Sequence, residues 1–339
     1  MKKIAIIVAN HLLRNNIFSA LPPIDFDNYL HHQRLLKEKL LENGYDLATY
    51  DINKIEDSEI VFYYDTIEPL PKKTNKQKNF LFLWESSVIS PKTYDMEKHK
   101  YFDKIFTWSG ELVDGDRYIK MCYSHEIIRK INFDLSGKNK LCTLVAGNKD
   151  VVHPLELYSK RIEAIRWFET HYPKDFDLYG RGWGNYLPRS WIAKKIYYHA
   201  PFGKKILSLL FKKPYSSYKG ELDAKIPVIA KYKFAICYEN ARDISGYITE
   251  KIFHCFFASC VPIYWGPEDI TDYIPQNCFI DKRRFSTYDE LYDHISTISD
   301  KDYLIYLKNI ESFLNSPQVE QFSALKFTEI VINEVVNEK

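Results

Sequence analysis

Charged and amide side chains interrupt an apolar part of the chain between residues 238 and 251. The segment reads YENARDISGYITEK, and apolar runs precede and follow it. If a strand ends at Tyr238 and a helix begins near Tyr247, the segment lies at the carboxyl edge of a parallel sheet, where open α/β sheets bind ligands. Free N–H groups in the first helical turn would stabilise a phosphate, and Lys251 would add a positive charge. Glu250 is compatible with the helix dipole but does not bind phosphate, and it would more naturally accept hydrogen bonds from sugar hydroxyls.

An ordinary capped helix explains the same residues. Ser245 or Gly246 would be its N-cap, and Glu250 would be a favourable acid in the first turn. Neither a Gly-x-Gly-x-x-Gly loop nor a Walker A loop occurs here, so the glycines add no support for a phosphate site. The spacing alone leaves both interpretations open.

A second candidate is Glu85, which closes the apolar run FLFLW at residues 80–84. A carboxylate at the carboxyl end of a strand, beside Trp84, could have the raised pKa that suits a general base. The alternative is a glutamate that is simply solvated at a strand end. Residue type and position alone favour the solvated glutamate.

A third candidate is a pair of arginines, Arg161 and Arg166, in a helix that follows the turn at Gly147. A guanidinium group can bind a diphosphate through two parallel hydrogen bonds. Helix position alone favours arginines that lie on a solvated surface.

Metal-binding patterns are weak in this sequence. Asp-x-Asp pairs occur at 114–116 and 175–177, and such pairs can hold a divalent ion on a nucleotide diphosphate. Two such pairs are close to chance, and one falls in a predicted turn and the other alternates across a predicted strand. The histidines show no metal-ligand spacing. We therefore expect both pairs to be structural and predict no metal site.

Composition limits the class of protein. The chain has 339 residues, 45% of them hydrophobic, and a formal net charge of +2, which gives no support for nucleic-acid binding. Its six cysteines lie mostly in apolar runs and are expected to be reduced core thiols. Because no run approaches about 20 apolar residues and the N-terminal run reads as a strand, we expect a cytoplasmic protein.

Alternating apolar runs and amphipathic segments predict an α/β protein with mostly buried strands. Strands are expected at 4–9, 45–50, 60–64, 80–84, 104–108, 118–123, 141–146, 176–179, 234–238, 261–265 and 278–281. Helices are expected between 29 and 43, at about 155–170 and 247–258, and through the tail after 286. The two successive cycles imply two Rossmann-like units.

The predicted domains are an N-terminal Rossmann-like domain (1–138), a C-terminal Rossmann-like domain (139–310) and a helical tail (311–339). Residues 183–218 form an excursion from the second domain in which lysines alternate with apolar residues. Its part at 194–213 could contact an anionic membrane surface. A helical segment that packs on its own domain with solvated lysines is the alternative.

The order of motifs between residues 232 and 266 resembles that of glycosyltransferase family 10, the α1,3/α1,4-fucosyltransferases. The donor motif of that family runs Tyr-Lys-Phe, Phe-Glu-Asn, Tyr-Val-Thr-Glu-Lys, and Val-Pro-Ile followed by a glycine. The corresponding segments here are YKF (232–234), YEN (238–240), YITEK (247–251) and VPIYWG (261–266). Further similar features are FDK at 102–104, Arg161 in its helix, and YGR at 179–181.

The resemblance implies a GT-B-like architecture, in which two Rossmann-like domains face a cleft. It also implies an inverting reaction that converts GDP-β-L-fucose into an α-L-fucoside by one displacement. Such a step needs a base for the acceptor hydroxyl and stabilisation of the charge on the departing GDP.

Residue by residue, the resemblance implies two catalytic carboxylates and a set of donor-binding residues. Glu85 matches the proposed general base, and Glu250 matches the carboxylate that binds fucose and stabilises positive charge on it. The matched donor-binding residues are Arg161, Lys251, Tyr247, Glu239, Asn240, Tyr238 and Thr249. Because cations and a helix end can replace a metal, no obligatory cofactor is implied, and activation by Mn²⁺ or Mg²⁺ is left open.

The leading prediction is an α1,3-fucosyltransferase that uses GDP-fucose and an oligosaccharide or glycolipid acceptor containing galactose or N-acetylglucosamine. We expect it to decorate lipopolysaccharide or another surface glycan, without a nucleic-acid partner. One alternative keeps the fold and uses another GDP-deoxyhexose. The other alternative is a sugar-nucleotide or glycan-binding protein without catalysis.

Overall fold

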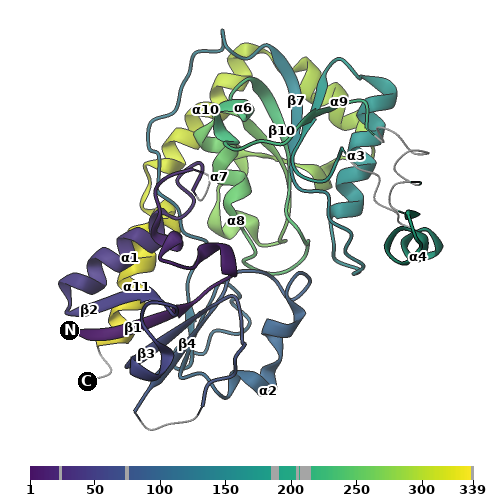
Figure 1. The fold of residues 1–339 in the computed structure, drawn as a ribbon. Helices are drawn as coiled ribbons and strands as arrows, with labels where there is room; N and C mark the ends of the chain where they lie inside the picture. The colour runs from purple at the N-terminus through teal and green to yellow at the C-terminus, as the bar shows by residue number, and fades with distance from the viewer. Residues whose placement is uncertain (23–24, 73–75, 185–190, 204–205, 207–214, 337–339) are drawn as a thin grey trace.

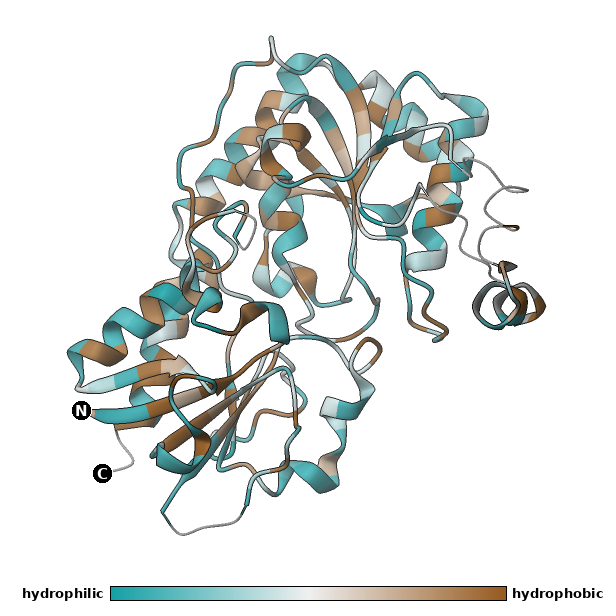
Figure 2. Ribbon diagram, in the orientation of Figure 1, coloured by the Kyte–Doolittle hydropathy of each residue, from teal (hydrophilic) through white to brown (hydrophobic). Residues whose placement is uncertain are grey.

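Two six-stranded parallel sheets organise the protein into two lobes (Figure 1). The computed structural model describes residues 1–336 except 23–24, 73–75, 185–190, 204–205 and 207–214. Figure 2 shows hydrophobic residues concentrated along the strands of both sheets. Such runs form strands because helices cover both faces of a parallel sheet, and both faces are then buried.

The first lobe has the strand order β2-β1-β3-β4-β5-β6. Its strands are β1 (Lys2–Ile7), β2 (Tyr45–Thr49), β3 (Ile60–Tyr64), β4 (Lys78–Leu83), β5 (Lys104–Thr107) and β6 (Tyr118–Lys120). Its helices are α1 (His31–Glu42) and the short α2 (Met96–His99). Because β4 ends at Leu83, the polar residues that follow it lie at the edge facing the second lobe.

The second lobe has the strand order β12-β11-β10-β7-β8-β9. Its strands are β7 (Lys140–Val145), β8 (Phe176–Tyr179), β9 (Tyr218–Gly220), β10 (Tyr232–Tyr238), β11 (Val261–Trp265) and β12 (Ile280–Asp281). Strands are added outward on one side from β7 to β9 and then on the other from β10 to β12. The order therefore reverses between β7 and β10, which is the position where Rossmann folds bind ligands.

The helices of the second lobe follow the same alternation. They are α3 (Tyr158–His171), α4 (Trp191–His199), α6 (Ile226–Ile229), α7 (Glu250–Phe257), α8 (Ile270–Tyr273), α9 (Tyr288–Thr297) and α10 (Asp300–Leu314). Helix α3 follows β7, and α7 connects β10 to β11. The first turns of α3 and α7 therefore lie near the point where the strand order reverses.

The C-terminal helix α11 (Ala324–Val336) returns to the first lobe, where it packs against α1 (Figure 1). Phe327, Val331 and Val335 are buried in the same apolar cluster as residues of β1 and β4. The two segments that connect the lobes pair where they cross, since the His125 N–H donates to the Phe322 carbonyl at 2.7 Å. The chain therefore passes between the lobes twice, at adjacent places.

The predicted α/β class and the two Rossmann-like units are confirmed, and several details differ. The helix expected at 247–258 begins at Glu250, and its N-cap is Thr249 rather than Ser245 or Gly246. The Ser245 hydroxyl instead donates to Asp269 at 2.6 Å. The capped-helix interpretation therefore named the wrong capping residue.

Candidate active site

A cavity of about 460 Å³ lies between the lobes at the carboxyl ends of the central strands. The first lobe contributes Glu85, and the second lobe contributes the ends of β7 and β10 and the starts of α3 and α7. Eight of the nine predicted site residues line it: Tyr238, Asn240, Tyr247, Thr249, Glu250, Lys251, Arg161 and Glu85. Glu85 and Lys251, which are 166 positions apart in the sequence, thus line the same cavity.

Glu239, the ninth predicted site residue, is fully buried and is not among the residues that line the cavity. Its carboxylate accepts hydrogen bonds from the Thr249 N–H at 2.9 Å, the Thr249 hydroxyl at 2.6 Å and Lys251 Nζ at 3.0 Å. The Tyr264 hydroxyl donates to it as well, at 3.2 Å. Glu239 therefore fixes the start of α7, and its predicted contact with the donor stays a prediction.

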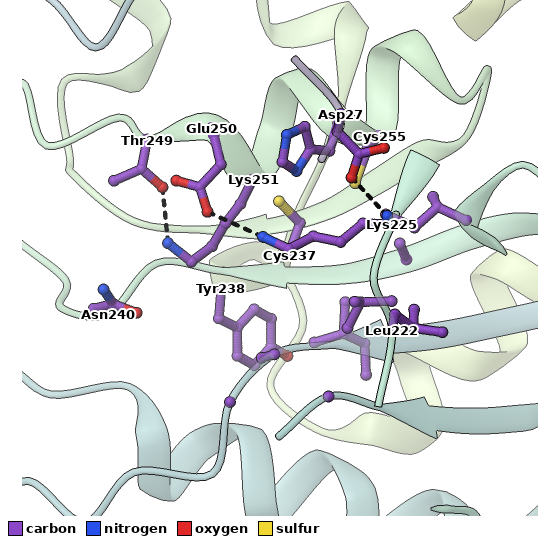
Figure 3. A pocket seen from close by; sticks show the side chains of 18 of the residues that line it. Asp27, Leu222, Lys225, Cys237, Tyr238, Asn240, Thr249, Glu250, Lys251 and Cys255 are labelled. Atoms are coloured by element: carbon purple, nitrogen blue, oxygen red, sulfur yellow. Dashed lines mark hydrogen bonds and ion pairs between the residues drawn. The ribbon is translucent and has the colours of Figure 1, made fainter. Parts of the chain in front are cut away.

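Lys251 holds a positive charge in the cavity wall. Its Nζ donates to Glu239 Oε2 at 3.0 Å and to Thr249 Oγ1 at 2.8 Å, and Figure 3 shows it beside Thr249. Burial alone would lower the pKa of Lys251, but the nearby carboxylates of Glu239 and Glu250 hold that pKa above its ordinary value. Lys251 is therefore protonated throughout the neutral range.

Arg161 lies in the first turn of α3 and is only 2% exposed. Its Nη2 donates to the carbonyl oxygens of Tyr238 at 2.7 Å and Glu239 at 2.8 Å, and to Asn240 Oδ1 at 3.1 Å. Burial lowers the pKa of Arg161, but arginine starts so far above neutral that it stays charged. These bonds fix the guanidinium against the end of β10.

Glu250, the first residue of α7, pairs with a lysine that the sequence analysis did not select. Its Oε1 lies 3.6 Å from Nζ of Lys225, and Figure 3 shows the two side chains pointing toward each other. Burial alone would raise the pKa of Glu250, but Lys251, Lys225 and His254 hold that pKa below its ordinary value. The carboxylate is therefore ionised at neutral pH.

A contact between the lobes fixes the segment that carries Lys225. The Asp27 carboxylate, from the first lobe, accepts hydrogen bonds from the Lys225 N–H at 2.6 Å and the Ile226 N–H at 3.3 Å. Asp27 thereby pairs with free N–H groups at the start of α6. The position of Lys225 in the second lobe thus depends on the first lobe.

Glu85 faces the cavity-lining residues of the second lobe from the first lobe. Its Oε2 accepts a hydrogen bond from the Tyr247 hydroxyl at 2.9 Å, and Asn240 Nδ2 donates to the same hydroxyl at 3.2 Å. The backbone N–H of Glu85 donates to Asp65 Oδ1 at 3.2 Å. The strand-end carboxylate is therefore oriented by both lobes, which a simply solvated glutamate would not be.

Sequence reasoning missed several residues that line the cavity, among them Lys225, Asp27, Tyr158 and His254. Lys225 and Asp27 lie in connections without a recognisable motif, so only the folded chain brings them to the site. Arg166, which was weighed beside Arg161, donates to Glu169 on the surface of α3 at 2.9 Å. The surface interpretation is therefore confirmed for Arg166.

Both Asp-x-Asp pairs form protein contacts. Asp114 accepts from the N–H groups of Asp116 and Tyr118, and Asp177 pairs with Lys140 and Lys219. In the described part of the chain, no cluster of three or more His, Cys, Asp or Glu side chains could hold a metal ion. Asp114 and Asp177 thus have protein partners, and metal binding or activation stays untested.

The six cysteines are free and buried, as expected of core thiols. Part of the 194–213 segment lies outside the described residues, and α4 precedes the undescribed part. None of the helices described for this chain is both long and apolar enough to cross a bilayer.

Comparison with known proteins identifies relatives of the second lobe. Residues 135–325 match the family model described as "Glycosyltransferase family 10 (fucosyltransferase) C-term". The chain is 40% identical to the alpha-(1,3)-fucosyltransferase FucT of Helicobacter pylori over 68 residues, which is 20% of this chain and 14% of that protein. It is 37% identical to the mouse 4-galactosyl-N-acetylglucosaminide 3-alpha-L-fucosyltransferase 9 over 84 residues, 24% of this chain and 23% of that protein. The matches thus span less than a quarter of each relative.

Solved structures show the same fold over the whole chain. A crystal structure of an alpha1,3-fucosyltransferase with GDP has a TM-score of 0.53 and 16% sequence identity, and the match covers 100% of this chain and 91% of that one. An alpha-glucosyltransferase in complex with UDP-glucose and DNA has a TM-score of 0.55 at 12% identity, with 99% of each chain covered. The predicted GT-B-like architecture is confirmed. Because the family model matches more than half of the sequence, this chain belongs to glycosyltransferase family 10.

Proposed function

We propose that this chain transfers L-fucose from GDP-β-L-fucose to a glycan containing galactose or N-acetylglucosamine, with inversion and formation of an α1,3 linkage. Family membership supports the reaction class, and relatives named as α1,3-fucosyltransferases support the transferred sugar and the linkage. The observation that carries the proposal is that Glu85 of one lobe and the cations Arg161 and Lys251 of the other line one cavity.

In this mechanism the acceptor hydroxyl gives its proton to Glu85 while its oxygen attacks the anomeric carbon of fucose. The bond between that carbon and the β-phosphate oxygen breaks, and GDP leaves with the electron pair. Arg161 and Lys251 stabilise the negative charge on the departing diphosphate. Glu250, ionised beside Lys225, stabilises the positive charge that develops on the sugar ring.

The protein supplies orientation as well as charge. The Tyr247 hydroxyl, held by Asn240, donates to Glu85 and leaves the other carboxylate oxygen for the acceptor hydroxyl. Glu239 fixes Lys251 and the start of α7 from behind the cavity. Such fixed donors and charges need little reorganisation during the reaction, which is where enzymes gain most of their rate.

The variant Glu85→Gln tests the mechanism, since Gln retains an acceptor for the Tyr247 hydroxyl but is not a base. We expect transfer to fall by about 100-fold or more, while the dissociation constant for GDP-fucose stays within about twofold. The control is Glu97→Gln, because Glu97 is an exposed residue of α2. Undiminished transfer by Glu85→Gln would remove this residue from the mechanism.

Donor and acceptor are tested separately from the base. Wild-type protein is offered GDP-fucose and other GDP-deoxyhexoses with a panel of glycans, and product linkages are determined by NMR. Turnover of a different GDP-sugar with no turnover of GDP-fucose would favour the alternative donor. Binding of GDP-fucose without transfer to any glycan would favour the non-catalytic alternative.

We further propose that the 194–213 segment contacts an anionic membrane surface. Exposed apolar residues near several lysines, in and around this segment, support the proposal. They are Ile192, Ile196, Phe202 and Ile206. Flotation with anionic liposomes tests it. Failure to bind them at low salt would contradict it.

A further inference from the structure

Tyr158 is the first residue of α3, three residues before Arg161. Its ring packs against the Arg161 guanidinium, whose central carbon is 4.7 Å from the ring centroid. Tyr158 lines the cavity between the lobes and is only 4% exposed. The side chain is therefore part of the wall that carries the cations of the site.

The hydroxyl of Tyr158 is buried and has no hydrogen-bond partner among the described residues. By contrast, Arg161 Nη2 and Lys251 Nζ already donate to protein acceptors. A buried hydroxyl without a partner destabilises a folded protein, so most such groups in native structures are hydrogen-bonded. The Tyr158 hydroxyl is thus a donor at the cavity that the protein itself leaves unused.

The charges around Tyr158 suit an anionic ligand. Burial raises the pKa of Tyr158, and the nearby cations Arg161 and Lys251 counteract that rise only in part. The side chain is therefore a neutral phenol that can donate a hydrogen bond at neutral pH. Its neighbours Arg161 and Lys251 attract the phosphate oxygens that could accept that bond.

We propose that the Tyr158 hydroxyl donates a hydrogen bond to a diphosphate oxygen of the bound nucleotide, beside Arg161 and Lys251. This inference rests on the proposed function, because it takes the nucleoside diphosphate of the donor as the ligand. The bond persists as GDP departs and helps to stabilise the charge on the leaving group. It would add a neutral donor to the two cations of the site.

The test is titration calorimetry of GDP with the variant Tyr158→Phe. Phe keeps the ring under Arg161 and removes only the hydroxyl oxygen. We expect GDP to bind about 10- to 100-fold more weakly, as for the loss of a hydrogen bond to a charged acceptor. Tyr303→Phe is the matched control, because its buried hydroxyl donates to the carbonyl oxygens of Lys233 and Ser259 and lies outside the cavity.

Thermal unfolding without ligand separates this role from a structural one. Tyr158→Phe removes a buried group without a partner, so its midpoint should equal or exceed that of the wild type. Tyr303→Phe removes the hydroxyl that donates to two backbone carbonyl oxygens, so its unfolding midpoint should fall while GDP affinity is unchanged.

The outcomes distinguish the inference from the proposed function. If wild type binds GDP and Tyr158→Phe binds it within about twofold, the inference is wrong and the proposed function stands. If affinity falls as expected but wild type transfers fucose to no glycan, the inference stands and the proposed function fails. Absence of GDP binding by wild type would overturn both.

Discussion

At the scale of single residues, the pairing of Glu250 with Lys225 predicts a change in pH dependence. In Lys225→Met, Glu250 loses one of the cations that hold its pKa down, so its pKa should rise. In the proposed mechanism the ionised form of Glu250 stabilises charge on the sugar, so the acidic limb of the kcat/KM profile should move to higher pH. We also expect kcat/KM for GDP-fucose to fall by about tenfold at neutral pH.

Lys225→Arg should restore most of the activity and the wild-type pH profile, since it retains the charge. Lys219→Met is the control, because Lys219 pairs with Asp177 away from the cavity. A pH profile of Lys225→Met that coincides with that of the wild type would show that Lys225 does not act through Glu250.

Asp65, which accepts a hydrogen bond from the backbone of Glu85, predicts a pH-dependent change in stability. Burial, with a contribution from the charge on Glu85, raises the pKa of Asp65 to about 6 from its ordinary value of 3.8. The folded protein therefore binds this proton more tightly than the unfolded chain does. The resulting penalty on stability is absent below about pH 4, grows from there to about pH 6, and is complete above it.

Asp65→Asn should therefore raise the free energy of unfolding by about 1–3 kcal/mol above pH 7. Asn retains the acceptor for the Glu85 N–H and tolerates the positive φ of 52° at this position. Urea unfolding between pH 4.5 and 8 measures the effect, which should shrink toward the acidic end. Asp57→Asn is the control, because Asp57 is exposed. If Asp65→Asn raised the free energy of unfolding equally at every pH, the raised pKa of Asp65 would not be the cause.

At the scale of elements, the ends of strands were predictable, but the start of helix α7 and the contacts that determine it were not. The apolar run 80–84 and the YEN motif placed Glu85 and Asn240 at strand ends, since burial on both faces ends where polar residues begin. The start of α7 was misplaced because Tyr247 packs in the interface between the lobes, where its ring lies 4.9 Å from that of Trp108. Tertiary contact outweighs local helix preference there.

The conformation of the loop before α7 predicts that adding one methyl group at Gly246 lowers stability. Gly246 has a φ of +76°, and an added Cβ would lie 2.7 Å from the Trp108 carbonyl oxygen of the other lobe. Gly246→Ala should therefore lower the free energy of unfolding by about 2–4 kcal/mol through backbone strain and this contact. Gly115→Ala is the matched control, because Gly115 has the same φ and no atom within 4 Å of an added Cβ.

Chemical unfolding of the two variants separates the two causes. Gly115→Ala should lower the free energy of unfolding by only about 1 kcal/mol, because it introduces backbone strain without a new contact. Equal losses of stability in both variants would show that the approach of the Gly246 loop to Trp108 contributes nothing.

At the scale of the whole molecule, the two α/β cycles followed from the order of apolar runs, but contacts between the lobes did not. Asp27 lies in a connection before α1, and its partner N–H groups lie 198 and 199 residues later. No periodicity links such positions, because the contact arises from how two separately folded sheets face each other. The same holds for Lys225 and Tyr158, whose roles depend on tertiary position.

The Asp27 contact predicts that the first lobe restrains a segment of the second lobe that lines the cavity. In Asp27→Ala, the N–H groups of Lys225 and Ile226 lose their acceptor, so the start of α6 should open more often. Hydrogen exchange should be about 3- to 30-fold faster at these two amides. Asp51→Ala is the control, because the Asp51 carboxylate accepts the Arg14 N–H within the first lobe. If exchange at 225 and 226 is as slow in Asp27→Ala as in wild type, the second lobe holds this segment alone, and the position of Lys225 beside Glu250 does not depend on the first lobe.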